Sequence, residues 1–276
     1  DEAGELSYYR FLADIAKTIR KDGDTVGNRL KDVAKKLFVK ARLTVSVTGE
    51  AAEKEALKKV LPLWLEAMPE GEKGTLLFNF DLQRRNEGIM TGGKVQYVAK
   101  GGNFRKHGFE YTGAMSVLTT ILQYEYLWIK VRVQGGAYGA HTRFSPNGDL
   151  VFCSYRDPNL AKTIQAYDDL PSYLESFDIP EREMTKYVIG TLSRIDTPLT
   201  PQLRTGLALG IYFAKATKAK RQERRDQLLN TTAGDIRALA PVVKAVMNDN
   251  NLCVMGSERK IKEEGRFFDD TVSLPK

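Results

Sequence analysis

Two segments of the sequence, separated by a constant offset, repeat the same order of structural signals. Residues 25–49 align without gaps with residues 232–256, and threonine, valine and glycine recur at matching positions. Each segment has the pattern of a capped helix followed by a turn, a strand and a final glycine. Any two helix-turn-strand segments share some identical capping and turn residues, but self-similarity at a fixed offset favours duplicated units. We therefore expect two related domains, the second nearly complete and the first represented by its C-terminal end.

Helical periodicity dominates the rest of the chain, with a smaller number of alternating, strand-like segments. A polar stretch at residues 70–74 marks the expected boundary between residues 1–74 and residues 75–276. The fold class expected from this pattern is α+β. Helices are expected at about 7–20, 25–37, 51–68 (with Pro62 inside), 111–130, 159–177, 182–194, 201–229 and 232–248, and strands at 43–47, 75–80, 94–99, 149–155 and 251–255.

Composition excludes several classes of protein. The 276 residues are 42% hydrophobic, yet charged residues interrupt every apolar window of membrane-spanning length. Two distant cysteines, Cys153 and Cys253, argue against a disulfide-stapled module and a cysteine-rich zinc site. The net charge of +7 mildly favours acidic partners, but the basic run Lys215–Asp226 contains acidic residues and is expected to be a solvated helix. Neither nucleic-acid nor membrane binding is therefore expected.

The start of the chain and its scarcity of histidine both bear on activity. The sequence begins with Asp1 and no leader follows, which predicts a piece of a longer protein. Only His107 and His141 are present. The segment HGFEY at 107–111 resembles a zinc-binding HxxEH in which tyrosine replaces the second histidine. Even with Glu183 as a further ligand it would make a poor zinc site, because such sites have three or four protein ligands.

Other forms of catalysis have no support in the sequence. His141 has no companion at the spacing of a catalytic triad, and Ser145 and Ser154 lack the context of a nucleophile elbow. No phosphate-binding glycine loop is present either. We therefore expect no catalytic residue, no metal ligand and no bound cofactor in this chain.

The segment LWIKVRVQGGAYG, residues 127–139, is a better candidate for binding. An amphipathic helix brings Arg132 to a glycine-rich break, after which Tyr138 lies among small residues. Arginine offers a fixed fork of donors to carbonyl or carboxylate oxygens, and tyrosine offers a ring and a hydroxyl. Glycine neighbours allow another backbone to approach closely. The combination fits a groove for an extended peptide, although these residues also fit a structural turn with Arg132 in a salt bridge.

The same segment carries a resemblance to a known family. Together with SYRDPNL at 154–160 and KYVIGTLSRIDTPLTP at 186–201, it looks like the C-terminal half of presequence-protease-like metallopeptidases, a branch of the insulinase (pitrilysin) superfamily. The similarity runs through nearly the whole chain. It implies LuxS/MPP-like α+β domains, four in two halves that close around a chamber for unfolded peptides. Zinc and an HxxEH motif then belong to the N-terminal half.

The resemblance also assigns parts to this chain. Residues 1–74 become the end of the third domain, and residues 75–276 become a fourth, non-catalytic domain. Matched by motif, Arg132 and Tyr138 are the substrate-binding residues, with peptides and the N-terminal catalytic half as partners and zinc only in the parent enzyme. A non-catalytic scaffold subunit of the same fold is the alternative. Substrate specificity and cellular compartment stay open.

Overall fold

A computed structural model describes residues 5–74 and 85–274 of the chain. The chain divides into two compact units. The first consists of the described residues up to Leu82 together with Pro198–Ala216, and the second consists of Gln83–Thr197 and Thr217–Lys276. In the described residues no helix is both long and apolar enough to cross a membrane.

The first unit is built from helices. Helix α1 (Glu5–Leu37) is interrupted at Asp22, whose backbone leaves the helical region (φ −155°, ψ 79°). The Asp22 carboxylate accepts a hydrogen bond from the Thr25 backbone N–H at 3.1 Å, so it caps the second part of the helix. The two helices expected at 7–20 and 25–37 are therefore confirmed. The short helix η1 (Lys40–Arg42), α2 (Ala51–Ala67) and α7 (Pro201–Phe213) complete the unit.

The strand expected at Leu43–Val47 is wrong. These residues have no regular secondary structure, although their apolar and polar side chains alternate. A strand needs a hydrogen-bonded neighbour, and no strand occurs among the described residues of the first unit. The strand expected at 75–80 lies outside the described residues. The two copies of the repeat therefore differ in structure. Residues 251–257 form a strand, whereas the equivalent residues after 42 do not.

The second unit contains a mixed six-stranded sheet in the order β3-β4-β2-β5-β1-β6. Strand β1 pairs in parallel with β5 and β6, and the other pairs are antiparallel. The strands expected at 149–155 and 251–255 are confirmed; β1, β3 and β6 were not expected. The strands are β1 (Glu87–Thr91), β2 (Tyr97–Asn103), β3 (Gly139–Phe144), β4 (Asp149–Tyr155), β5 (Asn251–Ser257) and β6 (Asp270–Ser273).

Strand β2 corrects the expectation for residues 94–99. It starts at Tyr97 and continues through Gly101 and Gly102, which we expected to end it. Gly101 lies so close to β4 that a β-carbon added to it would be 2.3 Å from the Leu150 carbonyl oxygen. Glycine at this position therefore permits the strand pairing instead of breaking it.

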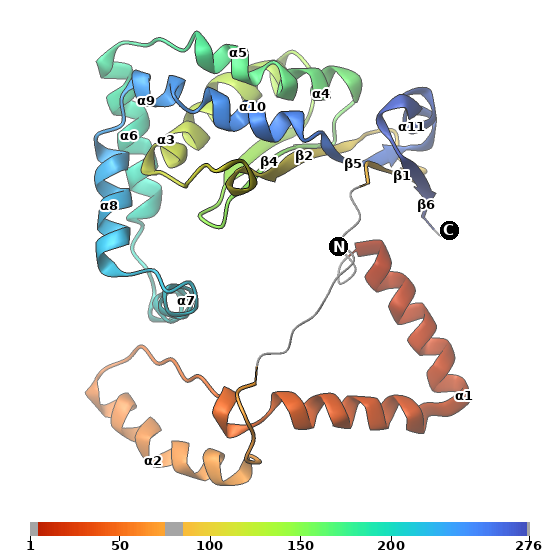
Figure 1. Ribbon diagram of the computed structural model, residues 1–276, viewed down its shortest axis with the longest axis vertical. Helices are drawn as coiled ribbons and strands as arrows, with labels where there is room; N and C mark the ends of the chain where they lie inside the picture. Colours follow the sequence, from red (N-terminus) through yellow and green to blue (C-terminus); the bar gives the residue numbers. More distant parts are fainter. Residues whose placement is uncertain (1–4, 75–84, 275–276) are drawn as a thin grey trace. The chain divides into compact units, whose positions relative to one another are not determined.

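Helices pack on one side of this sheet, where α4, α5 and α10 gather in Figure 1. Alternate residues of β4 are buried on that side, among them Leu150 and Phe152. Together with Val98, Leu118, Tyr167 and Val243 they form the core. The helical elements are η2 (Phe104–His107), α3 (Gly113–Ile121), the π-helical η3 (Leu122–Tyr126) and η4 (Trp128–Val133), α4 (Ala161–Asp168), α5 (Leu170–Glu175), α6 (Glu181–Ile195), α8 (Lys218–Leu229), α9 (Ala233–Arg237), α10 (Ala240–Asn248), α11 (Glu258–Glu263) and η5 (Gly265–Phe267).

This architecture confirms the α+β class, with corrections to several helices. The helix expected at 159–177 is two helices, α4 and α5, and the helix expected at 111–130 consists of α3 and the π-helical η3 and η4. The helix expected at 201–229 is two helices, α7 and α8, because the chain turns at Lys215 in the left-handed region (φ 49°). The helix expected at 232–248 is also two, α9 and α10. Thr232 caps α9 reciprocally with Asp235, as its capping pattern indicated. The basic run on α8 is exposed, and Arg225 forms a two-pronged ion pair with Asp196.

Candidate functional site

Arg132 lies near the end of η4, with its side chain exposed. Its guanidinium carbon is 4.0 Å from the centre of the Trp128 ring, one helical turn earlier. It forms no ion pair within the described part of the chain. The salt bridge that the sequence left open is therefore not formed with any residue that the structure describes. The aromatic surface holds the guanidinium by a cation–π contact and leaves its N–H donors available.

The chain reverses immediately after Arg132. The N–H of Gly136 donates to the Arg132 carbonyl at 2.8 Å, and the N–H of Ala137 donates to the Val131 carbonyl at 3.2 Å. Gly136 has a left-handed backbone (φ 80°), which glycine adopts without steric cost. Ala137 is buried and fixes the turn against the core. We refer to residues 132–138 as the 132–138 turn.

Tyr138 ends this turn and directly precedes β3, an edge strand of the sheet. Its side chain is 66% exposed. Its backbone N–H donates to the Tyr155 carbonyl at 3.1 Å, and its ring meets the Tyr155 ring at 5.7 Å in an edge-to-face arrangement. Tyr155 meets Tyr97 of β2 in the same manner at 5.3 Å. The Tyr138 backbone is thus fixed by β4 while its hydroxyl-bearing side chain stays accessible.

The residues after β4 support the turn from the other side. Asp157 is fully buried, and its carboxylate accepts hydrogen bonds from the Thr163 hydroxyl at 2.6 Å and the Asn159 N–H at 2.8 Å. Its backbone exchanges two hydrogen bonds with Gln96, which is also buried. Burial raises the pKa of Asp157 above its usual value, while the hydrogen bonds from Thr163 and Asn159 to its carboxylate oppose the change. We call residues 155–159 the 155–159 loop.

Asn159 connects this loop to the turn. Its side-chain amide donates a hydrogen bond of 2.5 Å to the carbonyl of Gly135, which lies between Arg132 and Tyr138. The two candidate residues therefore share one short connection, held by η4 at its start, by β4 at its end and by Asn159 in the middle. Sequence reasoning missed Asp157, Asn159 and Gln96. For Asp157 and Asn159 the only signal was the SYRDPNL segment, noted for its resemblance, and Gln96 had no signal.

The segment that carries Arg132 and Tyr138 has basic but no acidic residues. Residues 126–148, which run from the last residue of η3 through η4 and β3, contain no aspartate or glutamate, although Glu125 and Asp149 flank them. They contain Lys130, Arg132, His141 and Arg143. The surface around the 132–138 turn therefore favours negatively charged or carbonyl-bearing ligands over cations.

The residues considered for metal binding do not come together. His107 Nε2 lies 3.0 Å from Asp249 Oδ2, and Glu183 pairs with Lys186 at 2.6 Å. Ser145 accepts a hydrogen bond from Arg143, and Ser154 is buried in β4. No group of three or more metal-ligating side chains exists in the described residues. The residues present in ranges 5–74 and 85–274 therefore do not fit a zinc ion.

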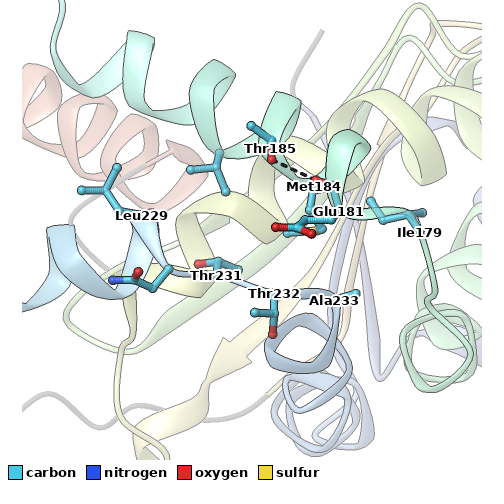
Figure 2. A pocket seen from close by; sticks show the side chains of 10 residues that line it. Ile179, Glu181, Met184, Thr185, Leu229, Thr231, Thr232 and Ala233 are labelled. Carbon is cyan, nitrogen blue, oxygen red and sulfur yellow. Dashed lines mark hydrogen bonds between the residues drawn. The ribbon is translucent and has the colours of Figure 1, made fainter.

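A second surface feature is a cavity of about 430 Å³ in the same unit. Figure 2 shows Glu181 and Thr185 of α6 together with Leu229 at the end of α8 and with Thr231 and Thr232 from the connection to α9. The Thr185 hydroxyl donates a hydrogen bond to the Glu181 backbone carbonyl, and the Thr232 side chain caps helix α9. Among the described residues that line this cavity, Glu181 is the only charged one, so the wall offers few groups for catalysis. The 132–138 turn is thus the better candidate site.

The fold is that of the domains of M16, or insulinase-type, peptidases. The peptidase M16 inactive domain from Pseudomonas fluorescens superposes on 83% of this chain and 57% of its own, with a TM-score of 0.56 and 14% identity. Pitrilysin superposes on 74% of this chain and 23% of its own, with a TM-score of 0.52 and 11% identity. At these identities the likeness defines the fold alone.

Sequence comparison gives the family. Residues 86–258 match the family described as the PreP C-terminal domain, and the chain belongs to that family. It is 39% identical over 271 residues to "Protein HypA" of Clostridium perfringens, covering 98% of this chain and 28% of the relative. It is 30% identical over 275 residues to "Presequence protease 1, chloroplastic/mitochondrial" of Arabidopsis thaliana, covering 98% and 26%. The chain thus spans about a quarter of the length of these relatives.

Proposed function

We propose that this chain is the substrate-binding, non-catalytic part of a zinc-dependent presequence-protease-like peptidase. Residues 1–74 would be the end of its third domain and residues 75–276 its fourth. The catalytic zinc and its ligands would belong to an N-terminal half, and this chain would help that half to enclose unfolded peptides. Family membership supports this assignment.

In this proposal Arg132 and Tyr138 bind the backbone of an extended peptide. The guanidinium of Arg132 has free donors for peptide carbonyl oxygens, because Trp128 contacts it only through its ring. The exposed Tyr138 supplies a ring face and a hydroxyl beside the edge of β3. Both residues would orient the peptide for hydrolysis by the other half and so increase the fraction of productively bound substrate.

The observation that carries the proposal is the rigidity of the connection between the two residues. The Gly136 N–H bonds to the Arg132 carbonyl, and the Asn159 amide bonds to the Gly135 carbonyl. A site that is ordered before the peptide arrives loses less conformational entropy on binding.

Steady-state kinetics of the proposed parent enzyme test the role. We expect Arg132→Ala and Tyr138→Phe each to lower kcat/KM for an unstructured peptide, by roughly tenfold or more for Arg132→Ala, because a charge-assisted hydrogen bond is lost. Lys130→Ala is the matched control, since it removes an exposed positive charge from the same helix. An unchanged kcat/KM in both site variants would remove the role and favour a scaffold subunit.

A further inference from the structure

Arg156 lies beside the proposed peptide-binding residues and has no part in their assignment. It directly follows β4, and its side chain is exposed. Its guanidinium carbon lies 5.5 Å from the centre of the Tyr155 ring and 6.0 Å from the centre of the Tyr138 ring. The same tyrosine that is proposed to contact peptide therefore also contacts this arginine.

The backbone of Arg156 is held in an unfavourable conformation. Its φ of 48° lies in the left-handed region, which arginine rarely adopts. On one side Tyr155 belongs to β4, and on the other Asp157 is fixed by Gln96, Thr163 and Asn159. Residues held in such conformations by their surroundings concentrate at functional sites. This strain presents the Arg156 side chain next to Tyr138.

No acidic group neutralises Arg156 within the described residues. It forms no ion pair there, and its side chain contacts the two tyrosine rings. The adjacent Asp157 is buried, and its oxygens accept hydrogen bonds from Thr163 and Asn159. The segment 126–148 on the neighbouring strand and helix contributes only basic charges. Within the described residues the guanidinium therefore has no carboxylate partner, and its hydrogen-bond donors are unused there.

We propose that Arg156 binds a carboxylate of the peptide, either its C-terminal carboxylate or an aspartate or glutamate side chain. This inference rests on the proposed peptide-binding function and specifies a substrate preference for that site. The two tyrosine rings hold the guanidinium, and its planar fork pairs with the two carboxylate oxygens. A peptide whose backbone lies along Arg132 and Tyr138 would then be preferred when a carboxylate reaches Arg156.

Fluorescence anisotropy of labelled peptides titrated with the chain tests the preference. Four versions of one unstructured peptide separate the two sources of carboxylate: a single glutamate or glutamine inside, each with a free or amidated C-terminus. We expect the version with neither carboxylate to bind about tenfold more weakly than the best version, because about 1.4 kcal/mol corresponds to tenfold in Kd. The arm that restores affinity identifies the source.

Variants of Arg156 assign the effect to this residue. Arg156→Asn removes the charge but keeps a residue that tolerates the left-handed region, so the fold is preserved. We expect it to bind all four peptides with one weak affinity, and Arg156→Lys to recover the preference in part. Thermal unfolding of both variants checks that they are folded. Lys130→Gln, which removes a nearby exposed charge, should keep the full preference.

The outcomes separate this inference from the proposed function. Equal affinity of the wild-type chain for all four peptides would overturn the role of Arg156 and leave peptide binding by Arg132 and Tyr138 intact. An equal loss of preference in Lys130→Gln would also overturn it, because the effect would then follow net charge. If no peptide binds at any concentration tested, the inference and the proposed function fail together.

Discussion

The side-chain amide of Asn159 donates a 2.5 Å hydrogen bond to the carbonyl of Gly135 and thereby joins the loop after β4 to the turn between Arg132 and Tyr138. Two segments that are more than twenty positions apart form one rigid unit through this bond and through the contact of Tyr138 with β4. The proposed peptide site therefore depends on residues that do not touch peptide themselves.

The first prediction concerns Asn159. Asn159→Ala should weaken peptide binding about fivefold, because the turn loses the bond that keeps its conformation fixed. The free energy of unfolding should fall by only about 1 kcal/mol, the usual contribution of one hydrogen bond. Anisotropy titration and chemical denaturation measure the two quantities. Asn159→Asp is a matched control of the same shape that lacks the donor; if it binds peptide like the wild type, the bond to Gly135 has no role in the site.

The second prediction concerns the pH dependence that Asp157 contributes. Burial raises its pKa in the folded chain above the ordinary value of 3.8. The folded chain therefore binds this proton more tightly than the unfolded chain, so the contribution of Asp157 to the free energy of unfolding decreases as pH rises above 3.8 and levels off above the raised pKa.

Asp157→Asn isolates this contribution, because asparagine keeps the shape and one acceptor oxygen and does not titrate. Denaturation of both chains over a pH series should show the wild type losing stability relative to Asp157→Asn as pH rises from about 4. Asp157→Ala should instead cost about 3 kcal/mol, since the Thr163 hydroxyl and the Asn159 N–H lose their partner. A difference between wild type and Asp157→Asn that does not change with pH would contradict the assignment.

The third prediction concerns the geometry of the turn. Gly136→Ala should lower the free energy of unfolding by about 1–2 kcal/mol, because its φ of 80° places a side chain in the left-handed region. A β-carbon there would lie at an ordinary contact distance of 3.4 Å from Pro158, so the backbone conformation accounts for the loss. Gly92→Ala is the control, because that position has open space and no left-handed backbone. Thermal denaturation compares them; equal stability of the two variants would show that the turn has another conformation in solution.

Much of the fold follows from local patterns. The strand at Asp149–Tyr155 was expected with its observed bounds because its side chains alternate and an Asn-Gly turn precedes it. Leu43–Val47 has the same alternation and forms no strand, because pairing depends on neighbours that a local pattern does not contain. Strand β3 was missed for the opposite reason: its sequence, GAHTRF, is weakly patterned, and its pairing with β4 determines its conformation.

Part of the candidate site could be predicted from local sequence, and part of it could not. Arg132 and Tyr138 were identifiable because their residue types and glycine neighbours occur in one short segment. Whether Arg132 formed a salt bridge or remained available depended on where its carboxylate neighbours fold, and the contact with Trp128 is visible only in three dimensions. Asp157 and Asn159 support the turn from a different strand end, so spacing along the chain gave no indication of their role.

Hydrogen exchange of the backbone amides, measured with and without a saturating unstructured peptide, tests the central claim most directly. The account predicts that exchange slows in the 132–138 turn and along β3, and that Arg132→Ala abolishes the slowing at the same peptide concentration. Slowing elsewhere in the chain with no change in the 132–138 turn, or slowing that survives in Arg132→Ala, would contradict it.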